Sequence, residues 1–146
     1  MTSEQSRFLL VVEDSDEDFE TVLDAARRTG LKHEIRRAAT GDDFLRLLGD
    51  WECGRLPKPA LVLLDLNTPG TDGRDALRII RQNERLRTLP LVILSTSANP
   101  RDVEFCYAAG ANAYHTKPVD YPAHLQMLHE IFDYWLHRVT LPPSSR

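Results

Sequence analysis

Three acidic residues, a serine and a lysine form the most chemically suggestive set in this 146-residue chain. Glu13 and Asp14 directly follow one apolar run, Asp65 ends a second and Ser95 ends a third, while Lys117 follows a short weaker run near the C-terminus. Crowded carboxylates repel one another, so a cation is the natural remedy, and oxygen-only ligands favour a hard ion such as Mg²⁺. The set therefore predicts a magnesium site.

A magnesium site built on carboxylates suits phosphoryl chemistry. A carboxylate beside the ion can act as a nucleophile on phosphorus and give an acyl phosphate. A lysine and a hydroxyl nearby can hold the remaining phosphoryl oxygens. No His, Cys or Ser is placed as an alternative nucleophile with its own base.

Each of these motifs also has a purely structural interpretation. The segment 13–16 could cap a helix with acids favoured by the helix dipole, and 95–97 could cap another. The segment 65–70 could be a turn closed by Asp and Asn side chains, and Lys117 could be a solvated lysine. Independent caps and turns have no reason to occur in this order, each at the end of its own strand, so the combination favours the functional interpretation.

The pattern of apolar residues predicts strands and helices that alternate five times. Three runs lack alternation and are typical of strands buried on both faces, and two weaker strands complete the set. The predicted strands are Phe8 to Val12, His33 to Ala38, Ala60 to Asp65, Leu91 to Ser95 and Asn112 to Thr116. Helical patterns follow each strand: Phe19 to Gly30, Thr40 or Asp42 to Leu48, Gly73 to Asn83, Pro100 to about Ala109, and Tyr121 to about Val139, with Gly49 to Pro59 predicted as a loop.

This alternation predicts an α/β fold, a doubly wound five-stranded parallel sheet with helices on both faces. Ligands of such sheets bind outside the carboxyl ends of the strands, where the acids, Ser95 and Lys117 would meet. We expect one domain over 7–140, with a disordered N-terminus over 1–6 and a tail over 141–146.

Composition excludes several classes of function. The net charge of −4 argues against bulk nucleic-acid binding, which needs a clustered basic face. No apolar run is long enough for a membrane span, and no signal peptide is visible at the N-terminus. Cys53 and Cys106 have no metal-binding spacing, and Cys106 is expected to be a small buried residue, so we expect a cytoplasmic protein without disulfides.

The motifs together resemble the receiver domains of two-component response regulators. The likeness spans Phe8 to about Val139. It rests on four segments: Val12-Glu13-Asp14, Leu64 to Gly73, Leu94-Ser95-Thr96 and Thr116-Lys117-Pro118. The resemblance implies a flavodoxin-like sheet of strand order 2-1-3-4-5.

The resemblance also assigns the metal and the phosphoryl acceptor. It implies that Asp65 is the phosphoacceptor and a metal ligand, that Asp14 binds Mg²⁺ directly, that Glu13 binds through water, and that Asn67 contributes its backbone carbonyl. Two departures are small: Glu13 replaces the commoner Asp, and Thr68 stands where Met is frequent.

The same family likeness implies a switch. Ser95 matches the hydroxyl that turns toward the phosphoryl group, Tyr114 the aromatic residue that moves with it, and Lys117 the contact to the phosphoryl oxygens. The bond between Lys117 and Pro118 is commonly cis in this family.

A narrower likeness is to the small regulators paired with bacterial phytochromes, carried by the 49–59 insertion and the long last helix. It implies a phytochrome-type sensor histidine kinase as partner. Because we expect no second domain after the receiver, we expect output through the face of the fourth helix, fifth strand and fifth helix, next to Ser95 and Tyr114. The last helix should partly cover the sheet, while Tyr134, Trp135 and Leu136 could form a homodimer seam.

Other functions remain open or fail on residue type. A terminal output, a phosphorelay shuttle to a histidine phosphotransfer protein, a phosphate sink and a non-phosphorylated scaffold share the same sequence pattern. A phosphatase of the haloacid-dehalogenase type would need an Asp where the chain has Asn67. A flavin-binding module would need a Gly- and hydroxyl-rich loop in place of 13–16. We therefore expect no enzymatic activity beyond the protein's own phosphorylation and dephosphorylation.

Overall fold

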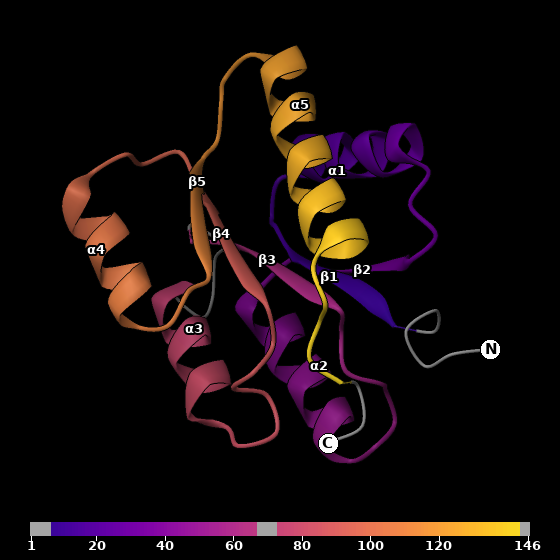
Figure 1. Ribbon diagram of the computed structural model, residues 1–146. Helices are drawn as coiled ribbons and strands as arrows, with labels where there is room; N and C mark the ends of the chain where they lie inside the picture. The colour runs from indigo at the N-terminus through magenta and orange to yellow at the C-terminus, as the bar shows by residue number, and fades with distance from the viewer. Residues whose placement is uncertain (1–6, 67–72, 144–146) are drawn as a thin grey trace.

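The computed structural model describes residues 7–66 and 73–143 (Figure 1). Five strands alternate with five α-helices, and a π-helical segment follows the last of them. The elements are β1 (Phe8–Val12), α1 (Asp16–Thr29), β2 (Glu34–Ala38), α2 (Gly41–Glu52), β3 (Leu61–Asp65), α3 (Gly73–Gln82), β4 (Leu91–Ser95), α4 (Pro100–Ala108), β5 (Ala113–Thr116), α5 (Tyr121–Phe132) and η2 (Asp133–Arg138).

The strands form one parallel sheet in the order β2-β1-β3-β4-β5. The predicted fold class and strand order are thereby confirmed. The chain order changes direction at β1 and β3, so their carboxyl ends open the crevice where such sheets bind ligands. Val12 pairs with Leu64 in register, which places the residues after β1 beside the end of β3.

Side chains alternate between two hydrophobic clusters on opposite faces of the sheet. Leu9 and Val11 of β1 face α1 and α5, which bury Val22, Leu128 and Phe132 among others. Figure 1 shows these two helices side by side over one face, with α2, α3 and α4 across the other.

The second face is covered unequally. The helix α3 buries Ala76, Leu77 and Ile80, whereas Cys106 is the one fully buried residue of α4. The prediction that Cys106 is a small buried side chain is confirmed. Among the helices on this face, α4 therefore has the fewest buried residues.

Short polar signals set the helix ends. The Ser15 side chain accepts a hydrogen bond from the Asp18 backbone N–H, and Thr40 caps α2 in the same way through Asp43. Gly30 ends α1 with φ of 69°, a left-handed conformation that glycine adopts without strain. The cap at Ser15 fixes the first turn of α1 directly after the acidic pair.

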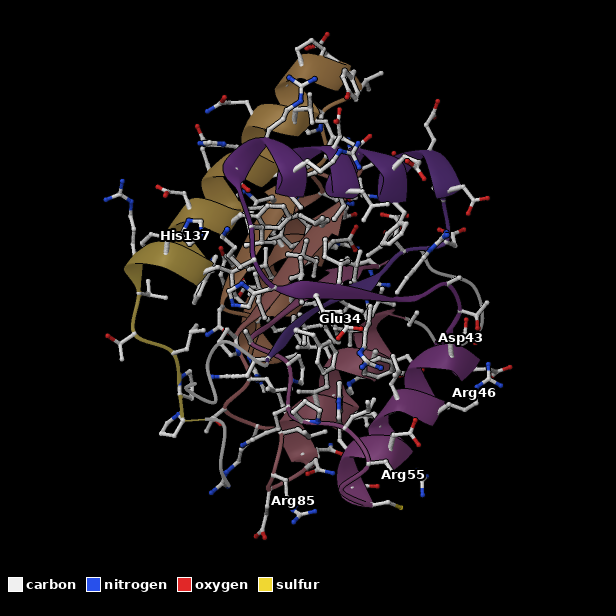
Figure 2. All side chains as sticks on the ribbon, turned by 90° about the vertical axis from the view of Figure 1, so that its right-hand side faces the viewer. Glu34, Asp43, Arg46, Arg55, Arg85 and His137 are labelled. Carbon is white, nitrogen blue, oxygen red and sulfur yellow. The ribbon has the colours of Figure 1, made fainter. Side chains whose placement is uncertain are left out.

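The edge strand β2 is more polar than the central strands. Figure 2 views the sheet from this edge, with Glu34 on β2 and the ion pair of Asp43 and Arg46 on the neighbouring α2. Arg36 and Arg37 point to opposite faces of the strand, where their guanidinium groups lie over the rings of Phe8 and Phe19. Charged side chains on an edge strand discourage pairing with another chain, and they explain why this strand has a weaker apolar pattern.

One sequence-based boundary was wrong, and one helix changes type along its length. The helix α2 continues to Glu52, into the segment 49–59 predicted as a loop, because Trp51 buries its indole against Phe8 with ring centroids 6.1 Å apart. The final helical segment ends at Arg138, close to the predicted end at about Val139, but it is not α-helical throughout. It changes at Asp133 to π-helical turns, which pack both Trp135 and Leu136 against the α1–α5 side of the core.

None of the helices within the described residues is long and apolar enough to cross a membrane.

Replacement of Gly73 by alanine should destabilise the fold. A Cβ at this position would lie 2.6 Å from the Leu66 Cα and 3.0 Å from its carbonyl oxygen, so backbone beside Asp65 would have to shift. We expect Gly73→Ala to lower the free energy of unfolding by about 1–3 kcal/mol in urea titrations. Gly49→Ala is the matched control, because its Cβ would meet nothing within 4 Å in α2. It should stabilise by about 0.4–1 kcal/mol; equal effects of the two changes would contradict the steric argument.

Candidate functional site

The carboxyl ends of β1, β3 and β4, with the segment after β5, bring the predicted polar residues to one rim of the sheet. Asp65 and Ser95 are the last residues of β3 and β4, and both are buried. The Lys117 backbone N–H donates to the Ser95 carbonyl at 2.7 Å, which ties the residue after β5 to the end of β4. Glu13 is held beside β2, because its N–H donates to the Ala38 carbonyl at 3.0 Å.

Three carboxylates on this rim could hold a metal ion. Ligand oxygens of Glu13, Asp14 and Asp65 all lie within 4.8 Å of one another. Glu13 and Asp65 are buried, at 3% and 4% exposure, whereas Asp14 is exposed. Two inner carboxylates and one outer carboxylate form an all-oxygen cluster that is open to solvent on one side.

The ammonium group of Lys117 lies among the acids. Its Nζ donates to Glu13 Oε1 at 2.8 Å, to Asp18 Oδ2 at 2.9 Å and to Asp65 Oδ2 at 3.3 Å. The lysine is itself buried, so these contacts replace the water that its charge has lost.

The surroundings shift two pKa values strongly. Burial is the main cause that raises the pKa of Glu13 from 4.5 to about 7, with further contributions from the hydrogen bond and the charge of Asp65 that outweigh the opposing effect of Lys117. Burial alone would lower the pKa of Lys117, but hydrogen bonds to Asp18 and Glu13 and the charges of Glu13 and Asp65 raise it overall. The lysine is therefore a permanent cation, and Glu13 can take up a proton near neutral pH.

Ser95 and Tyr114 are linked through the loop after β4. The Ser97 N–H donates to Ser95 Oγ at 3.1 Å, and the Tyr114 hydroxyl donates to the Ser97 carbonyl at 2.7 Å. The Ser97 hydroxyl in turn donates to Asp102 on α4 at 2.7 Å. One loop residue therefore connects the buried serine, the half-buried tyrosine and the fourth helix.

Two residues of this site were missed from sequence. Asp18 contacts Lys117 directly, although its spacing from Ser15 indicates only a helix cap. Arg37 on β2 donates from Nε to the Glu13 carbonyl at 2.9 Å and from Nη1 to Asp16 at 2.8 Å, so it braces the backbone of the acidic pair. No sequence signal distinguishes Arg37 from an ordinary charged residue on an edge strand.

Two residues expected at the site, Asn67 and Pro118, differ in what the structure shows of them. Asn67 lies outside the described residues, so its carbonyl is not placed. Within 7–66 and 73–143 no peptide bond is cis, so the bond between Lys117 and Pro118 is trans, against the expectation from family likeness. The trans form is the intrinsically preferred one for such bonds, by about 0.5–1 kcal/mol.

Comparison with known protein families agrees with this arrangement. Residues 9–129 match the model of the response regulator receiver domain, which is more than half of the chain. The chain belongs to this receiver family. The resemblance stated from the motifs is thereby confirmed.

The receiver is also similar to individual regulators over nearly its whole length. It is 37% identical to the response regulator Rcp1 of Synechocystis over 145 residues, 97% of each chain. Its fold matches the Mn²⁺-bound form of Rcp1 with a TM-score of 0.87 and 36% identity, over 94% of this chain and 99% of the other. It matches the phosphorylated cyanobacterial phytochrome response regulator RcpA with a TM-score of 0.88 and 32% identity, over the same shares.

The raised pKa of Glu13 predicts a pH dependence of stability in metal-free buffer. Between pH 4.5 and about 7 the folded receiver retains a proton that the unfolded chain has released. Since the folded state binds more protons, the free energy of unfolding contributed by Glu13 falls as pH rises, by at most about 1.4 kcal/mol per pH unit. Glu13→Gln should remove this slope in urea titrations at pH 5, 6, 7 and 8.

Glu17→Gln provides the control, because Glu17 is an exposed acid in the first turn of α1. Its stability curve should run parallel to that of the wild-type protein. A wild-type slope that Glu13→Gln leaves unchanged would show that another group takes up the proton.

Proposed function

We propose that this receiver accepts a phosphoryl group on Asp65 from a histidine kinase, with Mg²⁺ as cofactor. The observation that carries the proposal is the position of Lys117 Nζ, 3.3 Å from the Asp65 carboxylate within a cluster of three further acids. A buried carboxylate next to a fixed cation and a metal-binding acid pair is an arrangement suited to phosphoryl transfer.

The acids fit a divalent cation. Of the three clustered carboxylates, Glu13 and Asp65 contact the Lys117 ammonium and Asp14 adds a third negative charge, so the acids outnumber this cation, and the ligands are all hard oxygens. Asp14, Glu13 and Asp65 would hold the ion, with the Asn67 carbonyl as a further ligand. The ion, when bound, neutralises charge and binds phosphoryl oxygens. The Mn²⁺-bound form of the similar regulator Rcp1 supports a divalent cation here.

The proposed transfer uses one carboxylate oxygen of Asp65. That oxygen forms a bond to phosphorus while the bond between phosphorus and the donor breaks, and the electron pair of the broken bond leaves with the donor. The donor atom is an imidazole nitrogen of a phosphohistidine, or the carboxylate oxygen of acetyl phosphate. The product on Asp65 is an acyl phosphate, and Lys117 can donate to its oxygens.

Intact-mass spectrometry with acetyl phosphate tests the proposal. The wild-type receiver should gain the mass of one phosphoryl group in the presence of Mg²⁺ and none in EDTA. Asp65→Asn should gain none under either condition, because the amide is a poor nucleophile. The matched control is Asp75→Asn on α3, an exposed carboxylate paired with Arg78 and absent from the acidic cluster. A folded wild-type protein that gains no phosphoryl group with Mg²⁺ would contradict the proposal and favour the scaffold role.

We further propose a phytochrome-type histidine kinase as the donor and the cytoplasm as the location. The likeness to RcpA, which is a cyanobacterial phytochrome response regulator, supports the kinase class. The free thiols of Cys53 and Cys106 suit a reducing compartment.

Transfer from purified kinases tests the pairing. A phytochrome-type kinase phosphorylated with radiolabelled ATP should pass its label to the wild-type receiver within seconds to minutes, and to Asp75→Asn at the same rate. A kinase of an unrelated sensor class should transfer at least about tenfold more slowly, which corresponds to about 1.4 kcal/mol of discrimination. Equal rates from both kinases would remove the support for phytochrome pairing.

The output surface we propose is the face of α4, β5 and α5. Ser97 links Ser95, Tyr114 and α4, so a change at Asp65 can bias this face through one loop. We also propose a homodimer through the end of the last helix, where Tyr134 is exposed and Trp135 meets it edge-on at 5.3 Å.

A further inference from the structure

Asp18 occupies a capping position at the start of α1 but does not make the usual capping contact. Ser15 is the N-cap, and its side chain accepts the Asp18 N–H at 3.1 Å. In a capping box the acid at this third helical position returns a hydrogen bond to the N-cap backbone N–H. Here the Ser15 N–H donates instead to Glu13 Oε2 at 3.2 Å. The carboxylate of Asp18 therefore does not accept the hydrogen bond from the N-cap backbone that a capping box would give it.

That carboxylate binds the functional lysine. Lys117 Nζ lies 2.9 Å from Asp18 Oδ2, a contact shorter by 0.4 Å than its 3.3 Å contact to Asp65. An ammonium group has three donors and no acceptor. The contacts to Glu13, Asp18 and Asp65 use all three, so a phosphoryl oxygen on Asp65 has to compete with carboxylates that already hold Lys117.

The three acids differ in what they lose by releasing Lys117. The Glu13 and Asp65 side chains are 3% and 5% exposed, whereas the Asp18 side chain is 31% exposed. Water can replace Lys117 at Asp18 at small cost, which it cannot do at the two buried acids. Asp18 is therefore the partner that can release the Lys117 ammonium most easily when a phosphoryl group is present on Asp65. A substitution of Asp18 can change the strength of this ion pair.

We propose that Asp18 is a positioning residue that restrains phosphoryl transfer by holding Lys117 toward α1. The inference rests on the proposed function of Asp65. Transfer of a phosphoryl group adds about one further negative charge at Asp65. The fixed charge of Asp18 opposes that charge, and its ion pair with Lys117 must weaken for the lysine to serve the phosphoryl oxygens. Both effects slow transfer relative to a neutral residue at this position.

Initial rates of phosphorylation by acetyl phosphate with saturating Mg²⁺ test the restraint. Asp18→Asn keeps the side-chain shape and removes the charge, so its rate should rise by about three- to tenfold over wild type. Asp18→Glu restores a carboxylate that can reach Lys117, and it should return the rate to within about twofold of wild type.

Glu17→Gln is the matched control for the loss of charge. It removes one acid from the same helical turn, so it changes the net charge and the interaction with the helix dipole equally. Its rate should stay within about twofold of wild type, because Coulomb effects of an exposed charge are screened within about 8–10 Å. In urea titrations Asp18→Asn should unfold cooperatively and should be less stable than Glu17→Gln, because it alone loses the ion pair with Lys117. A rate that rises despite this loss of stability cannot come from a folding defect.

The measured rates distinguish failure of the Asp18 restraint from failure of phosphorylation on Asp65. An Asp18→Asn rate equal to that of Glu17→Gln, or slower than wild type, would overturn the restraint, as would an Asp18→Glu variant that is as fast as Asp18→Asn. In these cases the wild-type receiver still gains its phosphoryl group on Asp65, so the proposed function stands. Absence of any Mg²⁺-dependent gain in the wild-type protein would overturn both proposals together.

Discussion

The ammonium group of Lys117 is the charge around which this rim of the sheet is arranged. Glu13 comes from the end of β1, Asp65 from the end of β3 and Asp18 from α1, and each approaches the same nitrogen. A buried cation without partners would cost several kcal/mol, and so would the buried carboxylates without the cation. The ion pairs therefore make the closeness of three chain segments a condition of folding as well as of chemistry.

The hydrophobic core fixes where this charge cluster can form. Central strands buried on both faces leave no freedom of register, because a slip of one residue would exchange the side chains that face α1 and α5 with those that face the other helices. Polar residues can then appear only where the strands end. The close approach of Gly73 to Leu66 adds a steric constraint directly beside Asp65. Apolar packing thus supplies the precision with which the polar groups meet.

Sequence patterns were sufficient where one physical cause dominated. The unbroken apolar runs predicted the central strands, and the polar residue after each run predicted the shared rim that holds Glu13, Asp65 and Lys117. Sequence patterns were insufficient where two different structural roles produce the same residue types at the same spacing. The spacing of Ser15 and Asp18 is that of a cap, and only the three-dimensional contact to Lys117 shows the second use. Trp51 stands among loop-forming residues, and burial against Phe8 extended α2 past the predicted end.

The unequal anchoring of the helices has an energetic consequence for signalling. Each large aliphatic side chain that α3 buries contributes about 1.5–3 kcal/mol, whereas α4 fully buries one small thiol side chain. Phe105 of α4 also packs against the core but is only partly buried, so a displacement of α4 gives up less apolar burial than a displacement of α3 would. For the output surface proposed above, this means that α4 is the helix on this face of the sheet whose movement gives up the fewest fully buried side chains.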